Sequence, residues 1–86
     1  MKSSQTALST TATKIVAAEP LTRTICVHVL TGATYYIGGD NTVTTSNGFK
    51  LDNAAGPFTI TIPQNEELWA IVASGTPTVS VLVQGD

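Results

Sequence analysis

The sequence is short of charged residues, of cysteine and of histidine, and each shortage excludes a class of protein. Charged residues make up 12% of the 86 residues, and the net charge is −2 with only four basic side chains. Such a chain is a poor binder of phosphates, so we expect no nucleic-acid partner. Its single cysteine excludes an internal disulfide, and one cysteine with one histidine cannot build a zinc cluster.

Long hydrophobic runs are also missing. The longest fully apolar run, Leu68–Ala73, is far shorter than the roughly 20 residues that a membrane helix needs. Met1–Gln5 is followed by threonine and alanine rather than by an apolar run, so we expect no signal peptide. We therefore expect no membrane partner and synthesis in a cytoplasm. A chain of this length forms one small domain of marginal stability, for which oligomerisation is a common remedy.

The sequence does contain short runs of alternating apolar and polar residues, separated by turn residues about every ten positions. No window has the period of a helix. The runs span residues 13–18, 22–30, 35–37, 43–45, 49–51, 58–62, 68–73 and 78–83. Seven or eight short strands predict an all-β fold, a small antiparallel β-sandwich or jelly-roll-like barrel.

The central stretch, residues 35–51, is expected to organise the domain. Gly38–Asn41 and Asn47-Gly48 favour turns, and Val43 resumes an extended run between them. Phe49 and Leu51 then present two apolar side chains on one face. The alternation predicts the following core: Ile25, Val27, Val29, Ile37, Phe49, Leu51, Phe58, Ile60, Ile62, Leu68, Ala70, Val72, Val79 and Val81.

The N-terminal residues lack this alternation. Residues 1–12 are rich in serine and threonine without any apolar period, which predicts a flexible arm ahead of a single β domain at 13–86. Leu68–Ala73, in contrast, is apolar on both faces, so we place it centrally in a sheet or on the face of an oligomer.

No residue pattern points to catalysis or to a bound cofactor. Cys26 and His28 share one strand face, but no orienting group or oxyanion hole accompanies them. Asp40-Asn41 and Asp52-Asn53 offer oxygen ligands on loops without the spacing of a calcium motif. Glu66 and Glu67 are adjacent, so on a strand they would point to opposite faces. We expect a protein that is not an enzyme, with no metal, cofactor or small-molecule substrate.

Three aromatic residues, Tyr35, Tyr36 and Trp69, could line a sugar-binding platform. Because the chain has few aromatics, packing in the core or at an interface is the competing interpretation.

Four segments carry a resemblance to known proteins: Tyr36–Gly39, Val43–Leu51, Glu67–Thr76 and Val79–Leu82. In these segments, and over residues 14–83 as a whole, the sequence resembles small β-structured virion proteins of tailed bacteriophages. This resemblance implies a structural component of the particle, either a head decoration (cement) protein or a short head fibre. Minor tail proteins carry similar modules, and no catalytic residues carry over.

The resemblance sets the expected partners. A decoration protein on the outside of the virion would bind the major capsid protein and stabilise the assembled head, and we expect a homotrimer. The residues expected at an oligomer or capsid interface are Leu8, Tyr35, Tyr36, Trp69 and Ile71. The alternative is a tail or fibre module that recognises the host surface and binds carbohydrate.

Overall fold

The computed structural model describes residues 2–29, 34–52 and 57–84, and these residues form eight strands and no helix. The strands are β1 (Lys2–Ala7), β2 (Thr13–Val16), β3 (Arg23–Val29), β4 (Thr34–Gly38), β5 (Phe49–Asp52), β6 (Phe58–Ile62), β7 (Leu68–Ile71) and β8 (Thr78–Gln84). The predicted all-β fold is confirmed.

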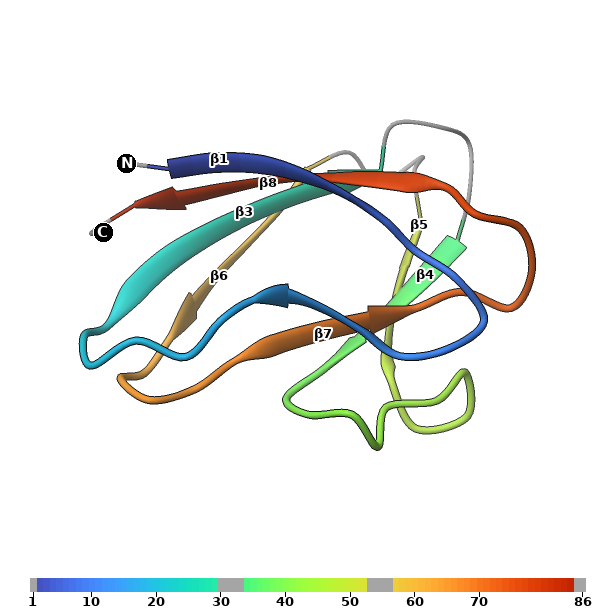
Figure 1. Cartoon of the computed structure of the whole chain (residues 1–86), viewed down its shortest axis with the longest axis horizontal. Coiled ribbons are helices and arrows are strands. Elements are labelled where there is room, and N and C mark those ends of the chain that lie inside the picture. The colour runs from blue at the N-terminus through green and yellow to red at the C-terminus, as the bar shows by residue number, and fades with distance from the viewer. Residues whose placement is uncertain (1, 30–33, 53–56, 85–86) are drawn as a thin grey trace.

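The strands form two four-stranded antiparallel sheets that pack face to face (Figure 1). Sheet A has the order β1-β8-β3-β6, and sheet B has the order β2-β7-β4-β5. Strands therefore pair from the two ends of the chain inward: β1 with β8, β2 with β7, β3 with β6 and β4 with β5. This is one long hairpin rolled into a jelly roll. The sheets stay separate as a sandwich and do not close into a barrel.

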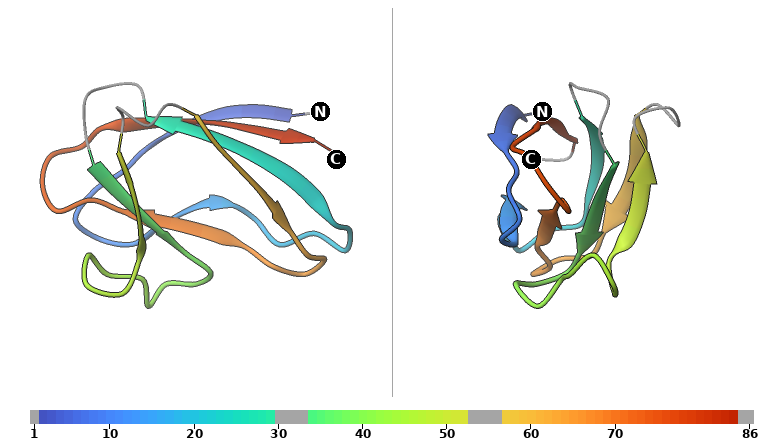
Figure 2. Two further views of the ribbon diagram at one scale, coloured as in Figure 1. Left: turned by 180° about the vertical axis from the view of Figure 1, so that it is seen from behind. Right: turned by 90° about the vertical axis from the view of Figure 1, so that its right-hand side faces the viewer.

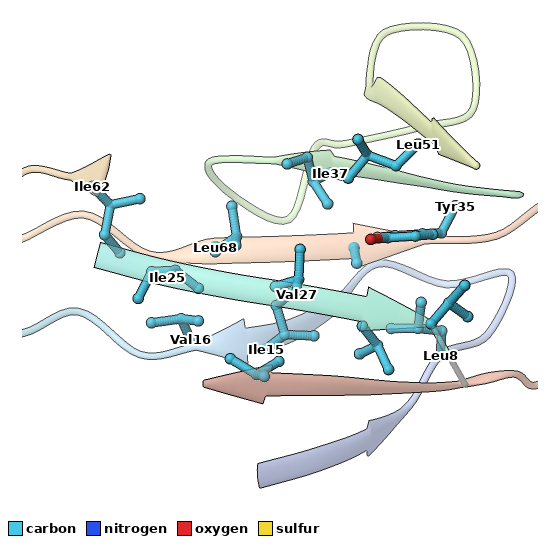
Figure 3. Packing of buried hydrophobic residues seen from close by; sticks show 14 of the residues in the cluster. Leu8, Ile15, Val16, Ile25, Val27, Tyr35, Ile37, Leu51, Ile62 and Leu68 are labelled. Atoms are coloured by element: carbon cyan, nitrogen blue, oxygen red, sulfur yellow. The ribbon is translucent and has the colours of Figure 1, made fainter. Parts of the chain in front are cut away.

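The core lies between the sheets, where inward-facing side chains from both layers meet (Figure 3). β3 shows the pattern most clearly, since Ile25, Val27 and Val29 are fully buried while the residues between them are half-buried. The predicted core residues that are buried are Ile25, Val27, Val29, Ile37, Leu51, Ile62, Leu68, Ala70, Val72, Val79 and Val81.

Three predicted core residues are not fully buried. Phe49 is 59% exposed, and Phe58 and Ile60 are only partly buried. All three lie on the inner faces of β5 or β6, which are the edge strands on one side of the sandwich. Their alternation is correct, but an edge strand has no neighbour beyond it to cover its side chains.

The expected flexible arm is wrong for Lys2–Leu8. Lys2–Ala7 pairs along its whole length with β8, and the Leu8 N–H donates to the Pro77 carbonyl at 2.8 Å. Leu8 itself is fully buried. β1 carries no apolar alternation because it is an edge strand held by backbone hydrogen bonds, while its side chains remain largely exposed. The domain therefore begins with β1 and not at residue 13.

The loop of residues 39–48 also differs from expectation. Val43–Thr45 is not a strand; Val43 is a buried loop residue, and Thr44 accepts a 2.8 Å hydrogen bond from the Gly48 N–H. The loop folds back onto the outer face of sheet B. A Cβ on Gly38 would lie 2.8 Å from Val43 Cβ, and one on Gly48 would lie 2.7 Å from Tyr36 Cβ. Two glycines thus permit the close approach of this loop.

The central placement of Leu68–Ala73 is confirmed for β7, which lies between β2 and β4. Leu68 and Ala70 face the core. Trp69 and Ile71 face outward, and Ile71 is nevertheless only 8% exposed. Ile71 is paired with Tyr36, and Gly48 of the 39–48 loop packs against Tyr36.

Truncating Leu8 tests the corrected N-terminus. Leu8→Ala should lower the free energy of unfolding by about 2–5 kcal/mol, because it removes a fully buried side chain and leaves a cavity. Ser4→Ala, at an exposed position of the same β1, should change it by less than about 0.5 kcal/mol. Urea denaturation measures both. An unchanged unfolding midpoint in Leu8→Ala would contradict the burial of Leu8 and support a flexible N-terminal arm.

The glycines at the two ends of the 39–48 loop, Gly39 and Gly48, provide a matched pair. Gly48→Ala should destabilise the fold by about 1–3 kcal/mol, since the new Cβ would collide with Tyr36 Cβ at 2.7 Å and with the Thr44 carbonyl at 2.9 Å. Gly39→Ala places its Cβ in open space, and it should be neutral or slightly stabilising. Equal melting temperatures for the two variants would show that the loop does not rest on sheet B.

Candidate binding surfaces

One side of the sandwich is open between the edge strands β5 and β6, which lie side by side in the end-on view of Figure 2. The opening is a groove of about 380 Å³. We call it the aromatic groove and define it by its apolar lining residues: Ile37, Phe49, Phe58, Ile60, Ile62 and Leu68.

Two phenylalanines dominate the aromatic groove. The ring centroids of Phe49 and Phe58 lie 5.6 Å apart with the planes tilted by 35°. This separation lies within the range of a favourable aromatic pair. Phe49 keeps 59% of its surface exposed, and it is the one large hydrophobic side chain that stands out from the described surface. An exposed aromatic above an apolar groove is a feature of protein–protein contact sites.

The rim of the aromatic groove is acidic. Glu66 and Glu67 line it at the end that precedes β7, and none of the described residues that line it is basic. Gly38, Gly39 and Pro63 complete the rim with backbone and a proline ring. The groove therefore suits an apolar side chain accompanied by a positive charge.

A polar cluster lies on the outer face of sheet B. The Trp69 indole N–H donates to Glu67 Oε1 at 2.7 Å, and Lys14 Nζ lies 3.4 Å from Glu67 Oε2. Lys14 Nζ is also 5.6 Å from the centroid of the Trp69 ring. The indole N–H hydrogen bond, helped by Lys14, holds the pKa of the Glu67 carboxyl below its ordinary value, against an opposing effect of burial.

Of the five residues expected at an interface, three are buried and two are half-buried. Leu8, Tyr35 and Ile71 are buried within the chain at 0%, 1% and 8% exposure, so their side chains are not available to a partner. Burial raises the pKa of the Tyr35 hydroxyl, with the charge of Cys26 as a smaller cause. Tyr36 and Trp69 are half-buried on the outer face of sheet B. The interface prediction is wrong for the three buried residues.

The aromatic platform is therefore incomplete. Tyr35 faces the core while Tyr36 faces outward, as neighbours on one strand must. Trp69 already has Lys14 over its ring. A sugar stacking on Trp69 would have to displace Lys14 or use the opposite ring face.

Cys26 and His28 lie on the outer face of β3, where both are half-buried. They pair across the sheet with Leu82 and Ser80, and His28 Nδ1 has no hydrogen-bond partner within the described part of the chain. No group of three or more metal-ligating side chains occurs within residues 2–29, 34–52 and 57–84.

The two aspartates that sequence reasoning considered for calcium have local roles. Asp40 Oδ1 accepts hydrogen bonds from the Thr42 hydroxyl and from the Thr42 N–H, and these bonds lower the pKa of the Asp40 carboxyl. Asp52 Oδ1 accepts a 2.8 Å hydrogen bond from the Thr34 hydroxyl across the β4–β5 pair.

No protein-family model matches this chain, and a search of curated proteins found no match of significance. In the part of the chain that the structure describes, no helix is long and apolar enough to cross a membrane.

Acid titration should protonate Glu67 and so disrupt its contacts with Trp69 and Lys14. The fluorescence of Trp69, the only tryptophan of the chain, should detect this change. Because the pKa of Glu67 is lowered in the folded state, its contacts stabilise the fold above the ordinary glutamate pKa of about 4.3 and are lost as the pH falls through the lower, folded value. We expect a fluorescence transition below pH ~4.3. Glu67→Gln should abolish that transition, and Glu66→Gln should retain it. A transition that survives in Glu67→Gln would assign it to another group.

Proposed function

We propose that this chain is a structural protein of a tailed-bacteriophage particle that binds the assembled head and stabilises it. The proposal rests on the resemblance at Tyr36–Gly39, Val43–Leu51 and Glu67–Thr76. The jelly roll is consistent with it, since such folds occur in viral capsid domains, although they also occur in lectins. The observation that carries the proposed mode of binding is the exposed Phe49 above the aromatic groove.

The proposed ligand of the aromatic groove is an extended segment of the major capsid protein. An apolar side chain of that segment would pack in the groove against the rings of Phe49 and Phe58, and a neighbouring basic residue would meet Glu66. β5 and β6 are edge strands, so either can add the backbone of an extended segment as a further strand. The acidic rim and the apolar groove thus select the same kind of segment.

The proposed stabilisation of the head is a consequence of linkage between binding and shell assembly. A protein that binds only the assembled shell stabilises that shell by mass action, because dissociation of the shell must also release the bound copies. Each copy needs only modest affinity where many are bound. A homotrimer would increase the number of simultaneous contacts. We retain the trimer as part of the proposal because so small a domain gains stability from association.

The second candidate, a tail or fibre module that binds host carbohydrate, is favoured by one observation. Tyr36 and Trp69 share the outer face of sheet B and are partly exposed there. Sugar binding on that face would not involve the aromatic groove, which lies between the inner faces of the sheets. Variants on the two faces therefore separate the candidates.

Phe49→Ala is the direct test of head binding. It should weaken binding to heads that lack this chain by about 10- to 100-fold, as expected for an exposed aromatic at the centre of an interface. Lys50→Ala, the exposed neighbour on the opposite face of β5, should bind as the wild type does. Co-sedimentation with the heads measures both variants, and circular dichroism should show that each keeps its fold.

Copy number and glycan binding also distinguish a head decoration protein from a tail or fibre module. Hundreds of copies per particle would support decoration of the head, and a few dozen or fewer would indicate the tail. If Phe49→Ala binds heads normally while Trp69→Ala loses saturable binding to host glycans, the second candidate is correct.

A further inference from the structure

β1 and β2 are the edge strands on the other side of the sandwich (Figure 2). A second opening lies beside them. It is a cavity of about 190 Å³ where β1 begins, β2 ends and β3 begins. We call it the arginine cavity. Its polar lining residues include Ser3, Ser4, Glu19 and Arg23, and Val16 and Val83 contribute apolar surface.

Arg23 is the only arginine of the chain and the only charged residue buried in the part that the structure describes, at 2% exposure. It occupies the inward phase of β3 together with Ile25, and it pairs with Ile62 on β6. Its side chain therefore enters the space between the sheets at one end of the core. Nη2 donates to the Glu66 carbonyl at 3.2 Å, whereas Nε has no hydrogen-bond partner among the residues that the structure describes.

The charge of Arg23 is not balanced within the described residues. Its one hydrogen bond goes to a neutral carbonyl, and no carboxylate forms an ion pair with it. A guanidinium stays charged at any pH at which a protein is folded, so it cannot escape burial by losing a proton. A buried charge without a counter-charge is strongly unfavourable.

These observations point to a ligand. We propose that the arginine cavity binds a small oxyanion, a carboxylate or phosphate group, with Arg23 as its principal ligand. The planar donor fork of arginine matches both groups. Ser4 lines the cavity and pairs with the inward-facing Val81, so its hydroxyl lies on the inner face of β1 as a further donor. A volume of about 190 Å³ compares with about 30 Å³ for one water in the liquid, so a compact anion fits.

Glu19 is the residue that opposes the ligand. Glu19 lines the same cavity without forming an ion pair with Arg23, and its backbone carbonyl accepts a 2.7 Å hydrogen bond from the Asn65 N–H. A negative side chain beside the cavity repels an anion. Removing that charge should tighten anion binding by roughly 2- to 5-fold, the range for one partly exposed charge pair.

The experiment uses the Nε–H signal of Arg23 in a nitrogen–proton spectrum of the whole labelled chain. Since Arg23 is the only arginine, that signal is unambiguous. Sodium phosphate, sodium acetate and sodium chloride are each titrated at constant ionic strength. We expect a saturable shift with phosphate, with acetate or with both, and none with chloride. A response to acetate indicates that a partner's carboxylate suits the cavity, and a response to phosphate alone indicates a phosphate ligand.

Two variants complete the test. Glu19→Gln should lower the dissociation constant for the same anion by roughly 2- to 5-fold. Arg23→Met should stay folded, because a buried charge replaced by an apolar side chain of similar size is often tolerated. Its melting temperature should be insensitive to the anion that raises that of the wild type. Lys50→Met, at an exposed position on β5, should respond as the wild type does.

Other outcomes overturn the proposal. An Nε–H signal unmoved by either anion in the wild type and in Glu19→Gln would show that water alone meets Arg23. A signal that responds only in Glu19→Gln would show that the Glu19 carboxylate is the counter-charge of Arg23 in solution. Equal responses in Arg23→Met and in the wild type would assign anion binding to another surface.

Discussion

The pairing of the first strand with the last is the contact on which the remaining structure depends. It joins Lys2–Ala7 to Thr78–Val83 in continuous antiparallel register, and it places β8 between β1 and β3. Without β1, β8 would be an edge strand, and Leu8 would leave the core. Closing so long a loop costs only slightly more than closing a shorter one, since the cost grows with the logarithm of length. The pairing of distant strands lowers the folding rate instead, because non-local contacts form slowly.

The same topology fixes where the molecule can bind anything. A jelly roll has two sheets and therefore four edges, and they meet in pairs along two sides of the sandwich. Along one side, β5 and β6 leave Phe49 and Phe58 around an apolar groove. Along the other, β1 and β2 leave a smaller cavity with Arg23 in its wall. The two openings share one scaffold but offer opposite chemistry.

Much of this fold could be predicted from the sequence, because the alternation of apolar residues is local. It placed β2 to β8 and most of the core, but it missed β1 and predicted a strand at 43–45, where the structure has a loop. It did not reveal which strands become edges, and this is why Phe49, Phe58 and Ile60 were expected in the core and are found around a groove. Strand order depends on pairings between distant segments, of which a single sequence carries no local trace.

The burial of Arg23, Tyr35 and Leu8 was not predicted from the sequence, and only two of these three positions had a local signal. Arg23 precedes Ile25 by two positions, and Tyr35 precedes Ile37 by two, so the inward phase of each strand already assigned them to the interior. Extending the alternation to these positions would have found both. Leu8 had no such signal, since it is a single apolar residue after a polar strand. Its burial follows only from the β1–β8 pairing.

The proposed modes of binding therefore rest on side chains at the two openings rather than on the fold. A jelly roll is compatible with a capsid protein and with a lectin, so the architecture alone does not choose between them. An aromatic side chain that remains 59% exposed beside a groove loses favourable burial in the isolated chain, and a partner would restore it. The guanidinium of Arg23 is 2% exposed and has no counter-charge among the described residues, which is electrostatically unfavourable, and a bound anion would remove that cost. Because Arg23 also holds the carbonyl of Glu66, a residue of the groove rim, both openings are built on the same end of the core.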